Sequence, residues 1–327
     1  MRCRKCGQKA VINMRQHKLA LCCEHFLQWV PEQTERFIQK YKMFARDERV
    51  LLAVSGGKDS LALWDILLRL GFAADGLYIE LGIDGDMQYG QRSQACARKF
   101  ADAHGAHLIT VDVHRKYGAT IPELAQLTRR GKDKPCSVCG VSKRYIMNYV
   151  AREGGYAVLL TGHNLDDEAA VLFQNTLHWQ TGYLARQAPV LPATDAGFVR
   201  KVKPLCRFYE RETAAYALLR GIDYLYAECP FSVGANTIYY KELLGRLEAE
   251  RPGSKLQFYL SFLQAREDGY FAGAKDDEGV RSCERCGQPT TAPGSCAFCR
   301  MWAAVRERKR ESRGGSENPV VTQACGR

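Results

Sequence analysis

Residues 50–67 read VLLAVSGGKDSLALWDIL and join a strand to a helix. An apolar run typical of a buried strand passes into Ser-Gly-Gly-Lys-Asp-Ser, and a helical pattern begins at Lys58. The two glycines let backbone N–H groups point inward, and the first turn of a helix adds partial positive charge. Ser55 and Ser60 can donate hydrogen bonds, and Lys58 can neutralise negative charge. The junction therefore predicts an anion site, with phosphate as the first candidate.

Strands and helices alternate on both sides of this junction. The alternation predicts an α/β fold with a parallel, doubly wound sheet. Further helices follow without intervening strands. The expected strands lie at 49–54, 75–81, 107–113 and 156–162, and the expected helices lie at 31–44, 58–70, 90–105, 138–155, 166–178, 207–220, 235–249 and 255–266.

Composition and charge narrow the class of protein. The chain has 327 residues, of which 46% are hydrophobic, so it can bury a substantial core. It lacks an apolar run of about 18 residues, and its N-terminus lacks the apolar core of a signal peptide, so we expect a cytoplasmic protein and no membrane partner. The net charge of +11, with basic clusters near both chain ends, favours a polyanionic partner such as nucleic acid.

Cysteine spacing predicts metal sites at both ends of the chain. Fourteen cysteines in a cytosolic protein argue for metals rather than disulfides. A Cys-x-x-Cys pair, a gap, and Cys-x-x-His fit a tetrahedral zinc site near the N-terminus, with Cys23 as an alternative to Cys22. Two further Cys-x-x-Cys pairs predict a second zinc near the C-terminus. The expected ligands are Cys3, Cys6, Cys22 and His25, and then Cys283, Cys286, Cys296 and Cys299.

A third group of cysteines has a different pattern. Cys136 and Cys139 form a pair, and Cys229 precedes a proline, as cluster ligands do in some ferredoxins. Three cysteines on a 4Fe–4S cluster would leave one iron open to an exogenous sulfide. The alternative is a buried thiol pair and an unrelated core cysteine.

Taken together, these motifs resemble a known family. Residues 55–60 match the PP-loop of ATP pyrophosphatases, and TGHNLDDEA at 161–169 looks like a conserved segment of PP-loop tRNA-modifying enzymes. With the two zinc units and the third cysteine group, residues 1–305 resemble the tRNA 2-thiouridine synthetases of the TtuA type and their wobble-uridine relatives.

The resemblance implies a domain organisation. An N-terminal zinc finger would occupy 1–27, and a linker helix would occupy 28–48. The PP-loop ATP pyrophosphatase domain would follow at 49–275, with a C-terminal zinc finger at 276–310. Residues 311–327 would form a disordered tail.

The resemblance also implies roles for site residues. Asp59 would help to place Mg²⁺ and the phosphates of ATP, and Asp167 would be a further catalytic carboxylate. Lys143, one helical turn beyond Cys139, would serve both ATP and the cluster, although it could be a solvated helix lysine. Asp167 could likewise be a helix-end charge. The expected ATP-binding residues are Ala53, Val54, Ser55, Gly56, Gly57, Lys58, Asp59, Ser60, Ile79, Lys143 and Gly162.

The reaction implied by the family is tRNA 2-thiolation, catalysed by an ATP-dependent tRNA sulfurtransferase. The enzyme would adenylate uridine O2 and replace it with sulfur held on the 4Fe–4S cluster, with the T-loop uridine as the expected target. A ubiquitin-like carrier protein would supply the sulfur, and a homodimer is one candidate assembly. The alternatives are the wobble uridine, an anticodon-loop cytidine, a PP-loop ligase that uses ammonia, and a non-catalytic zinc-ribbon RNA-binding protein.

Overall fold

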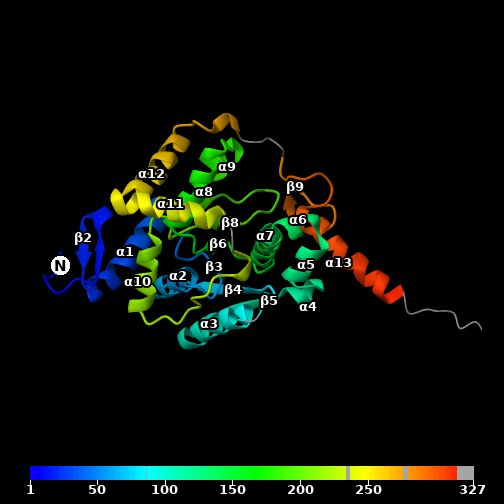
Figure 1. The fold of residues 1–327 in the computed structure, drawn as a ribbon, viewed down its shortest axis with the longest axis horizontal. Coiled ribbons are helices and arrows are strands. Elements are labelled where there is room, and N and C mark those ends of the chain that lie inside the picture. The colour runs from blue at the N-terminus through cyan, green and yellow to red at the C-terminus, as the bar shows by residue number, and fades with distance from the viewer. Residues whose placement is uncertain (86, 233–235, 275–278, 315–327) are drawn as a thin grey trace, which may run out of the picture.

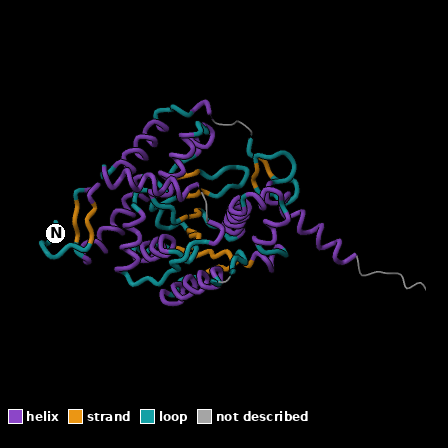
Figure 2. The backbone as a smooth tube through the Cα atoms, in the orientation of Figure 1, coloured by secondary structure: helices purple, strands orange, loops and turns teal. Residues whose placement is uncertain are grey.

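The centre of the molecule is a six-stranded sheet with helices on both faces (Figures 1 and 2). The computed structural model describes residues 1–85, 87–232, 236–274 and 279–314. The strand order is β5-β4-β3-β6-β8-β7, and all neighbours are parallel except β7, which pairs antiparallel with β8. The expected α/β fold is confirmed, and two strands that the sequence analysis missed extend the sheet, the parallel strand β8 and the antiparallel edge strand β7. The strands are β3 (Val50–Val54), β4 (Ala74–Glu80), β5 (Leu108–Asp112), β6 (Val158–Thr161), β7 (Val190–Leu191) and β8 (Arg200–Val202).

The seven helices predicted between residues 58 and 266 are present, with ends within three residues of those expected. They are α2 (Lys58–Arg69), α3 (Tyr89–His104), α7 (Pro135–Glu153), α8 (Leu165–Leu177), α10 (Glu210–Leu219), α11 (Asn236–Glu250) and α12 (Ser254–Glu267). The sequence analysis missed four short helices, which are too brief to show a period of their own. These are α4 (Val113–Tyr117), α5 (Ile121–Leu127), α6 (Arg129–Asp133) and α9 (Thr181–Arg186).

Two hydrophobic cores lie on opposite faces of the sheet. Val50 and Leu52 of β3 belong to one core, and Leu51 belongs to the other, because successive side chains of a strand point to opposite faces. The first core is covered by α1, α2, α3 and α10 and includes Cys3 and Cys22. The second is covered by α5 and α7 and includes the C-terminal cysteines. Each cysteine-rich unit therefore shares a core with one face of the sheet.

The N-terminal unit consists of a hairpin and a long helix. β1 (Ile12–Met14) and β2 (Leu19–Leu21) flank η1 (Arg15–His17), and α1 spans Cys23–Lys40 rather than the predicted 31–44. Pro31 therefore lies inside the helix, where its missing N–H leaves the carbonyl of Leu27 without its usual partner. Arg69 of α2 donates to that carbonyl at 3.0 Å, which satisfies it and fastens α1 to the sheet domain.

The C-terminal unit lies at the other end of the long axis (Figure 1). It contains β9 (Arg281–Ser282), β10 (Pro289–Thr290) and α13 (Ala297–Gly314). The helix continues to Gly314, so the expected tail over 311–327 is wrong for its first four residues. The rest of that tail lies outside the described residues. Among the helices of the described ranges, none combines the length and apolar character needed to cross a bilayer.

Candidate active site

The strand-to-helix junction at residues 55–60 forms a tightly closed loop. Gly56 has a φ of +74°, and a Cβ atom there would lie 2.1 Å from the carbonyl oxygen of Ser93, so only glycine fits. The Ser60 hydroxyl accepts a hydrogen bond from the Ser55 N–H at 3.1 Å and donates to the Gly57 carbonyl at 3.0 Å. The loop therefore keeps its shape through its own side chains and lies at the N-terminus of α2.

Gly162 closes the loop from the neighbouring strand. It follows β6, and a Cβ atom there would lie 2.9 Å from the Ser60 nitrogen and 3.0 Å from the Asp59 carbonyl carbon. The close contact of Gly162 in the structure is with the loop backbone, and its predicted approach to the nucleotide stays a prediction. Any larger residue would push β6 away from the first turn of α2.

A chain of ion pairs borders this loop. Lys58 contacts Asp59 at 3.1 Å and Glu210 at 2.7 Å. Lys241 contacts Asp167 at 2.6 Å and Glu210 at 3.3 Å, so Glu210 bridges the two lysines. The sequence analysis identified neither Glu210 nor Lys241, because nothing in the local pattern of α10 or α11 marks them. The fold brings them to the loop from a long distance along the chain.

Burial and these partners set the acidity of the two carboxyl groups. Burial raises the pKa of Asp59, and the charge of Lys58 and a hydrogen bond from Thr213 only partly oppose this effect. Burial also acts to raise the pKa of Glu210, but its contacts with Lys58 and Lys241 outweigh burial and lower the pKa. The pKa values of the two carboxyl groups therefore shift in opposite directions, with Asp59 raised and Glu210 lowered.

Asp167 has a structural role and a position at the site. Its carboxylate accepts from the Asn164 N–H at 3.0 Å, and Asn164 Oδ1 accepts from the Asp167 N–H at 3.1 Å, forming a capping box at the start of α8. Asn164 Nδ2 also donates to Asp59 at 3.2 Å. The helix-end role of Asp167 is therefore present, and the same carboxylate binds Lys241. Its catalytic role stays a prediction.

Cys136, Cys139 and Cys229 lie in one neighbourhood. The Cys136 thiol donates to the carbonyl of Phe231 at 2.9 Å, which brings the segment after Cys229 against the start of α7. Burial raises the pKa of Cys136 and of Cys139, the Cys229 thiol raises both further, and Lys143 acts to lower both. Such mutual repulsion between thiolates is relieved by a bound metal centre. The charge of Lys143 therefore acts on both thiols, and its predicted role toward ATP and the cluster stays a prediction.

Four cations lie close to one another, and two of them, Lys143 and Arg144, also act on Cys139. This cationic group consists of Lys143, Arg144, Lys201 and Lys203. Within it, Lys203 contacts Glu168 at 2.7 Å. Burial together with Lys203 and Arg144 lowers the pKa of Lys201 to about 8. Burial also lowers the pKa of the adjacent His163 to about 4, so this histidine is neutral. The sequence analysis missed Lys201 and Lys203, which fit no motif.

A short segment connects the loop with the cysteines. The Leu225 N–H donates to the carbonyl of Gly56 at 3.0 Å, and Cys229 follows four residues later. Burial and the neighbouring Tyr226 raise the pKa of Tyr224 to about 12, and Lys58 and Asp59 also act on it, which places its ring beside the loop. The predicted anion site and the predicted cluster site thus share one region of the molecule.

Both predicted four-ligand sets assemble. Among the described residues, the ligand atoms of Cys3, Cys6, Cys22 and His25 all lie within 4.8 Å of one another, as do those of Cys283, Cys286, Cys296 and Cys299. The sulfur atoms of Cys6 and Cys22 are 3.7 Å apart, and those of Cys286 and Cys296 are 3.8 Å apart. A tetrahedron with metal–sulfur bonds of about 2.3 Å has edges of about 3.8 Å, so both sets fit a tetrahedral metal ion. Cys136, Cys139 and Cys229 do not form a third set this compact.

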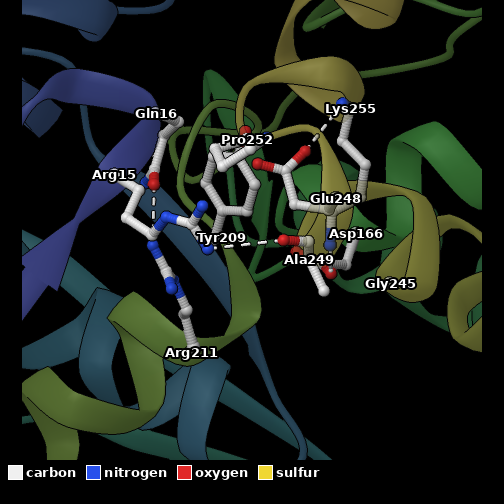
Figure 3. A pocket seen from close by; sticks show the side chains of 10 residues that line it. All are labelled: Arg15, Gln16, Asp166, Tyr209, Arg211, Gly245, Glu248, Ala249, Pro252 and Lys255. Carbon is white, nitrogen blue, oxygen red and sulfur yellow. Dashed lines mark hydrogen bonds and ion pairs between the residues drawn. The ribbon is translucent and has the colours of Figure 1, made fainter.

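The N-terminal unit meets the sheet domain around a pocket of about 210 Å³ (Figure 3). Arg15 donates to the carbonyl of Ala249 at 3.3 Å, and Arg211 donates to Gln16 at 2.7 Å. Lys255 pairs with Asp166 in the pocket wall, and the other oxygen of Asp166 accepts from the Glu210 N–H at 2.8 Å. Asp166 and Glu210 therefore connect this pocket with the ion pairs at the loop.

The C-terminal unit holds α7 from the opposite side. Phe298 stacks on Tyr145 with ring centroids 3.6 Å apart, and Trp302 donates to Ser142 at 3.4 Å. Asn148 donates to Gln288 at 2.8 Å. Because α7 also carries Cys136, Cys139 and Lys143, the C-terminal unit fixes the helix that presents these side chains to the site.

Comparisons with known proteins agree with this geometry. Residues 2–27 match the family model described as "2-thiouridine synthetase TtuA, N-terminal LIM domain". The chain is 51% identical to a tRNA-5-methyluridine(54) 2-sulfurtransferase of Thermus thermophilus, over 95% of this chain and 94% of the relative. It is 44% identical to the Thermotoga maritima protein of the same name, over 95% and 99% of the two chains.

A solved structure extends the comparison to three dimensions. The U34-tRNA thiolase NcsA from Methanococcus maripaludis, determined with its 4Fe–4S cluster, is 27% identical and superposes with a TM-score of 0.71. The match covers 82% of this chain and 88% of NcsA. Similarity therefore extends across the sheet domain and is not confined to the cysteine-rich ends.

Proposed function

Since this chain belongs to the family of the tRNA-5-methyluridine(54) 2-sulfurtransferases, we propose that it uses ATP to replace O2 of uridine 54 in tRNA with sulfur. The family resemblance expected from the motifs is confirmed by these relatives. One observation carries the proposal: the Leu225–Gly56 hydrogen bond places the loop at 55–60 and Cys229 on either side of a short segment. A base in that region would be close to both ATP and sulfur.

The loop at 55–60 suits the phosphates of ATP. Backbone N–H groups at the start of α2, the hydroxyl groups of Ser55 and Ser60, and Lys58 supply the hydrogen bonds and positive charge. Asp59 and Asp167 supply carboxylate oxygens of the kind that Mg²⁺ binds together with phosphate. Main-chain groups of Ala53, Val54 and Ile79 end the adjacent strands, where the adenosine would lie.

The first step activates the base. Uridine O2 attacks the α-phosphorus of ATP, pyrophosphate leaves, and N3 of the base loses its proton. Lys58 and the backbone N–H groups stabilise the charge that develops on the phosphates. Pairing with Asp59 and Glu210 raises the pKa of Lys58 despite its burial, so the ammonium ion is present at neutral pH.

The second step exchanges oxygen for sulfur. A sulfur nucleophile adds to C2, the bond between C2 and O2 breaks, and AMP leaves with the oxygen that belonged to the base. Cys136, Cys139 and Cys229 would hold a 4Fe–4S cluster, which when bound supplies an open iron that binds sulfur as a Lewis acid. The charge of Lys143 acts on both Cys139 and His163, so Lys143 would orient the anionic sulfur and the departing AMP.

The two outer metal sites would hold zinc and support binding of tRNA. Cysteine thiolates and histidine at tetrahedral spacing are typical zinc ligands, and the ion would stabilise each small unit. The basic residues of both units would contact the tRNA backbone from opposite ends of the molecule, and binding should weaken with salt. A tRNA substrate supports the expectation that the protein acts in the cytoplasm. A ubiquitin-like sulfur carrier and a homodimer remain predictions.

Pyrophosphate release and nucleoside analysis test this proposal. Protein reconstituted with iron and sulfide without air should release pyrophosphate from ATP only when tRNA is present, and the tRNA should gain 2-thiolated uridine. Fragment mass mapping should place the sulfur at position 54; sulfur at position 34 would instead assign the activity named for NcsA. A protein that binds tRNA but releases no pyrophosphate would be a non-catalytic RNA-binding protein.

A further inference from the structure

The segment between the ATP loop and the third cysteine group carries an exposed aromatic ring at Tyr226. Tyr226 is 73% exposed, whereas the preceding Tyr224 and Leu225 are 7% and 8% exposed. The Leu225 hydrogen bond to Gly56 fixes this buried pair to the loop. The Tyr226 side chain is therefore exposed to solvent and follows a buried pair that is bound to the loop.

The position of Tyr226 is limited by the chain. It lies one residue after the contact with Gly56 and three residues before Cys229. Four residues span at most about 14 Å, so the whole passage from the loop to the thiol is short. Under the proposed function, the reacting base must occupy this passage, because its O2 meets the α-phosphate and its C2 meets the sulfur.

One face of the Tyr226 ring is already supported. The rings of Tyr224 and Tyr226 are 4.3 Å apart between centroids and are tilted by 35°. Tyr224 is in turn held beside Lys58 and Asp59, whose charges act on its hydroxyl group. An aromatic ring that is backed on one face and open to solvent on the other is a stacking platform for a base.

We propose that Tyr226 stacks on the extruded target pyrimidine and positions it between ATP and the sulfur site. The inference rests on the proposed function and adds a residue that holds the base. Its chemistry is the aromatic face, so phenylalanine should replace tyrosine, whereas leucine, which is apolar but has no ring, should not. Base–aromatic stacking contributes about 1–3 kcal/mol per base, which corresponds to about 5- to 150-fold in affinity.

A binding cycle with two RNAs tests stacking directly. The probes are a T-arm hairpin RNA with uridine at the target position and the same hairpin with dihydrouridine, whose ring is not planar. In the wild type, dihydrouridine should weaken binding about 10-fold, and Tyr226→Ala should weaken binding of the uridine hairpin by a similar factor. Tyr226→Ala should bind both hairpins equally, because the protein change and the RNA change each remove the same stacking interaction. Tyr226→Phe should match the wild type.

The controls separate stacking from a structural effect. Tyr270→Ala removes another ring that is 80% exposed, outside the site, and should leave both affinities unchanged. ATP affinity should also be unchanged in Tyr226→Ala. The inference would be overturned if Tyr226→Ala bound the uridine hairpin as tightly as the wild type does. It would also be overturned if Tyr226→Ala still bound the dihydrouridine hairpin more weakly than the uridine hairpin. The affinities for the hairpins can be measured without turnover, so they test stacking even if the thiolation assay refutes the proposed function.

Discussion

Replacing Lys201 by methionine should raise the free energy of unfolding and lower the thiolation activity. Lys201 is a half-buried ammonium among Lys143, Arg144 and Lys203, and Glu168, the carboxylate acting on it, is already paired with Lys203. A change in the pKa of Lys201 from 10.5 to about 8 corresponds to at most about 3 kcal/mol of stability lost to its charge. Solvent screening at a partly exposed side chain reduces this figure, so we expect a gain of about 1–2 kcal/mol.

The assay is urea unfolding of wild type and Lys201→Met, followed over a range of pH. The folded-state pKa of Lys201 lies below its unfolded value, so the charge penalty is complete below about pH 8 and disappears as pH rises toward 10.5. The advantage of the variant should therefore be full at about pH 7 and small at about pH 10. Methionine keeps the length of the side chain, which limits changes in packing.

Activity should move in the opposite direction. Lys143 and Arg144 of the cationic group act on Cys139, and under the proposed function the anionic sulfur and the phosphates would meet near that thiol. Removing one charge of the group should therefore lower thiolation about 10-fold or more. The reasoning would be refuted if Lys201→Met were less stable than wild type at neutral pH, or if its stability advantage did not change with pH. Lys203→Met is the matched contrast. It leaves the buried Glu168 carboxylate without its ion-pair partner Lys203 and should lower the free energy of unfolding.

Three further changes test separate parts of the account. Gly162→Ala places a methyl group about 3 Å from the Asp59–Ser60 backbone, which should cost about 1–3 kcal/mol and weaken ATP binding, measured by unfolding and nucleotide titration. Cys229→Ala should abolish thiolation and lower the iron content of protein purified without air, while ATP affinity stays unchanged; retained thiolation would remove Cys229 from the site. Cys286→Ser should lower zinc content, measured by elemental analysis, and should unfold the C-terminal unit so that α7 loses its contact with Phe298. Unchanged activity in Cys286→Ser would show that this unit does not position α7.

The parts of the site that are contiguous in sequence could be predicted. The loop at 55–60 and both outer cysteine sets depend on short spacings, which a strand–helix junction or a metal ion imposes locally. Cys229 could be connected with Cys136 and Cys139 only through its following proline. The structure supplies the physical link, which is the contact of the Cys136 thiol with Phe231.

The parts that depend on distant contacts could not be predicted. Glu210 and Lys241 lie on helices with no distinguishing pattern, and their pairing with Lys58 and Asp167 arises only when α10 and α11 pack beside the loop. The extent of α1 was also missed, because the carbonyl orphaned by Pro31 is satisfied by Arg69, a residue outside that helix. Such compensation has no signature in the local sequence.

The fate of the uridine oxygen tests the central claim most directly. A tRNA carrying a heavy oxygen isotope at O2 of the target uridine would be incubated with ATP, sulfide and reconstituted protein, and the AMP would be analysed by mass spectrometry. If the base is adenylated at O2 before sulfur adds, each new thiouridine should be matched by one AMP that carries the label. Unlabelled AMP beside thiolated tRNA would contradict adenylation at O2 and, with it, the shared site for ATP and sulfur.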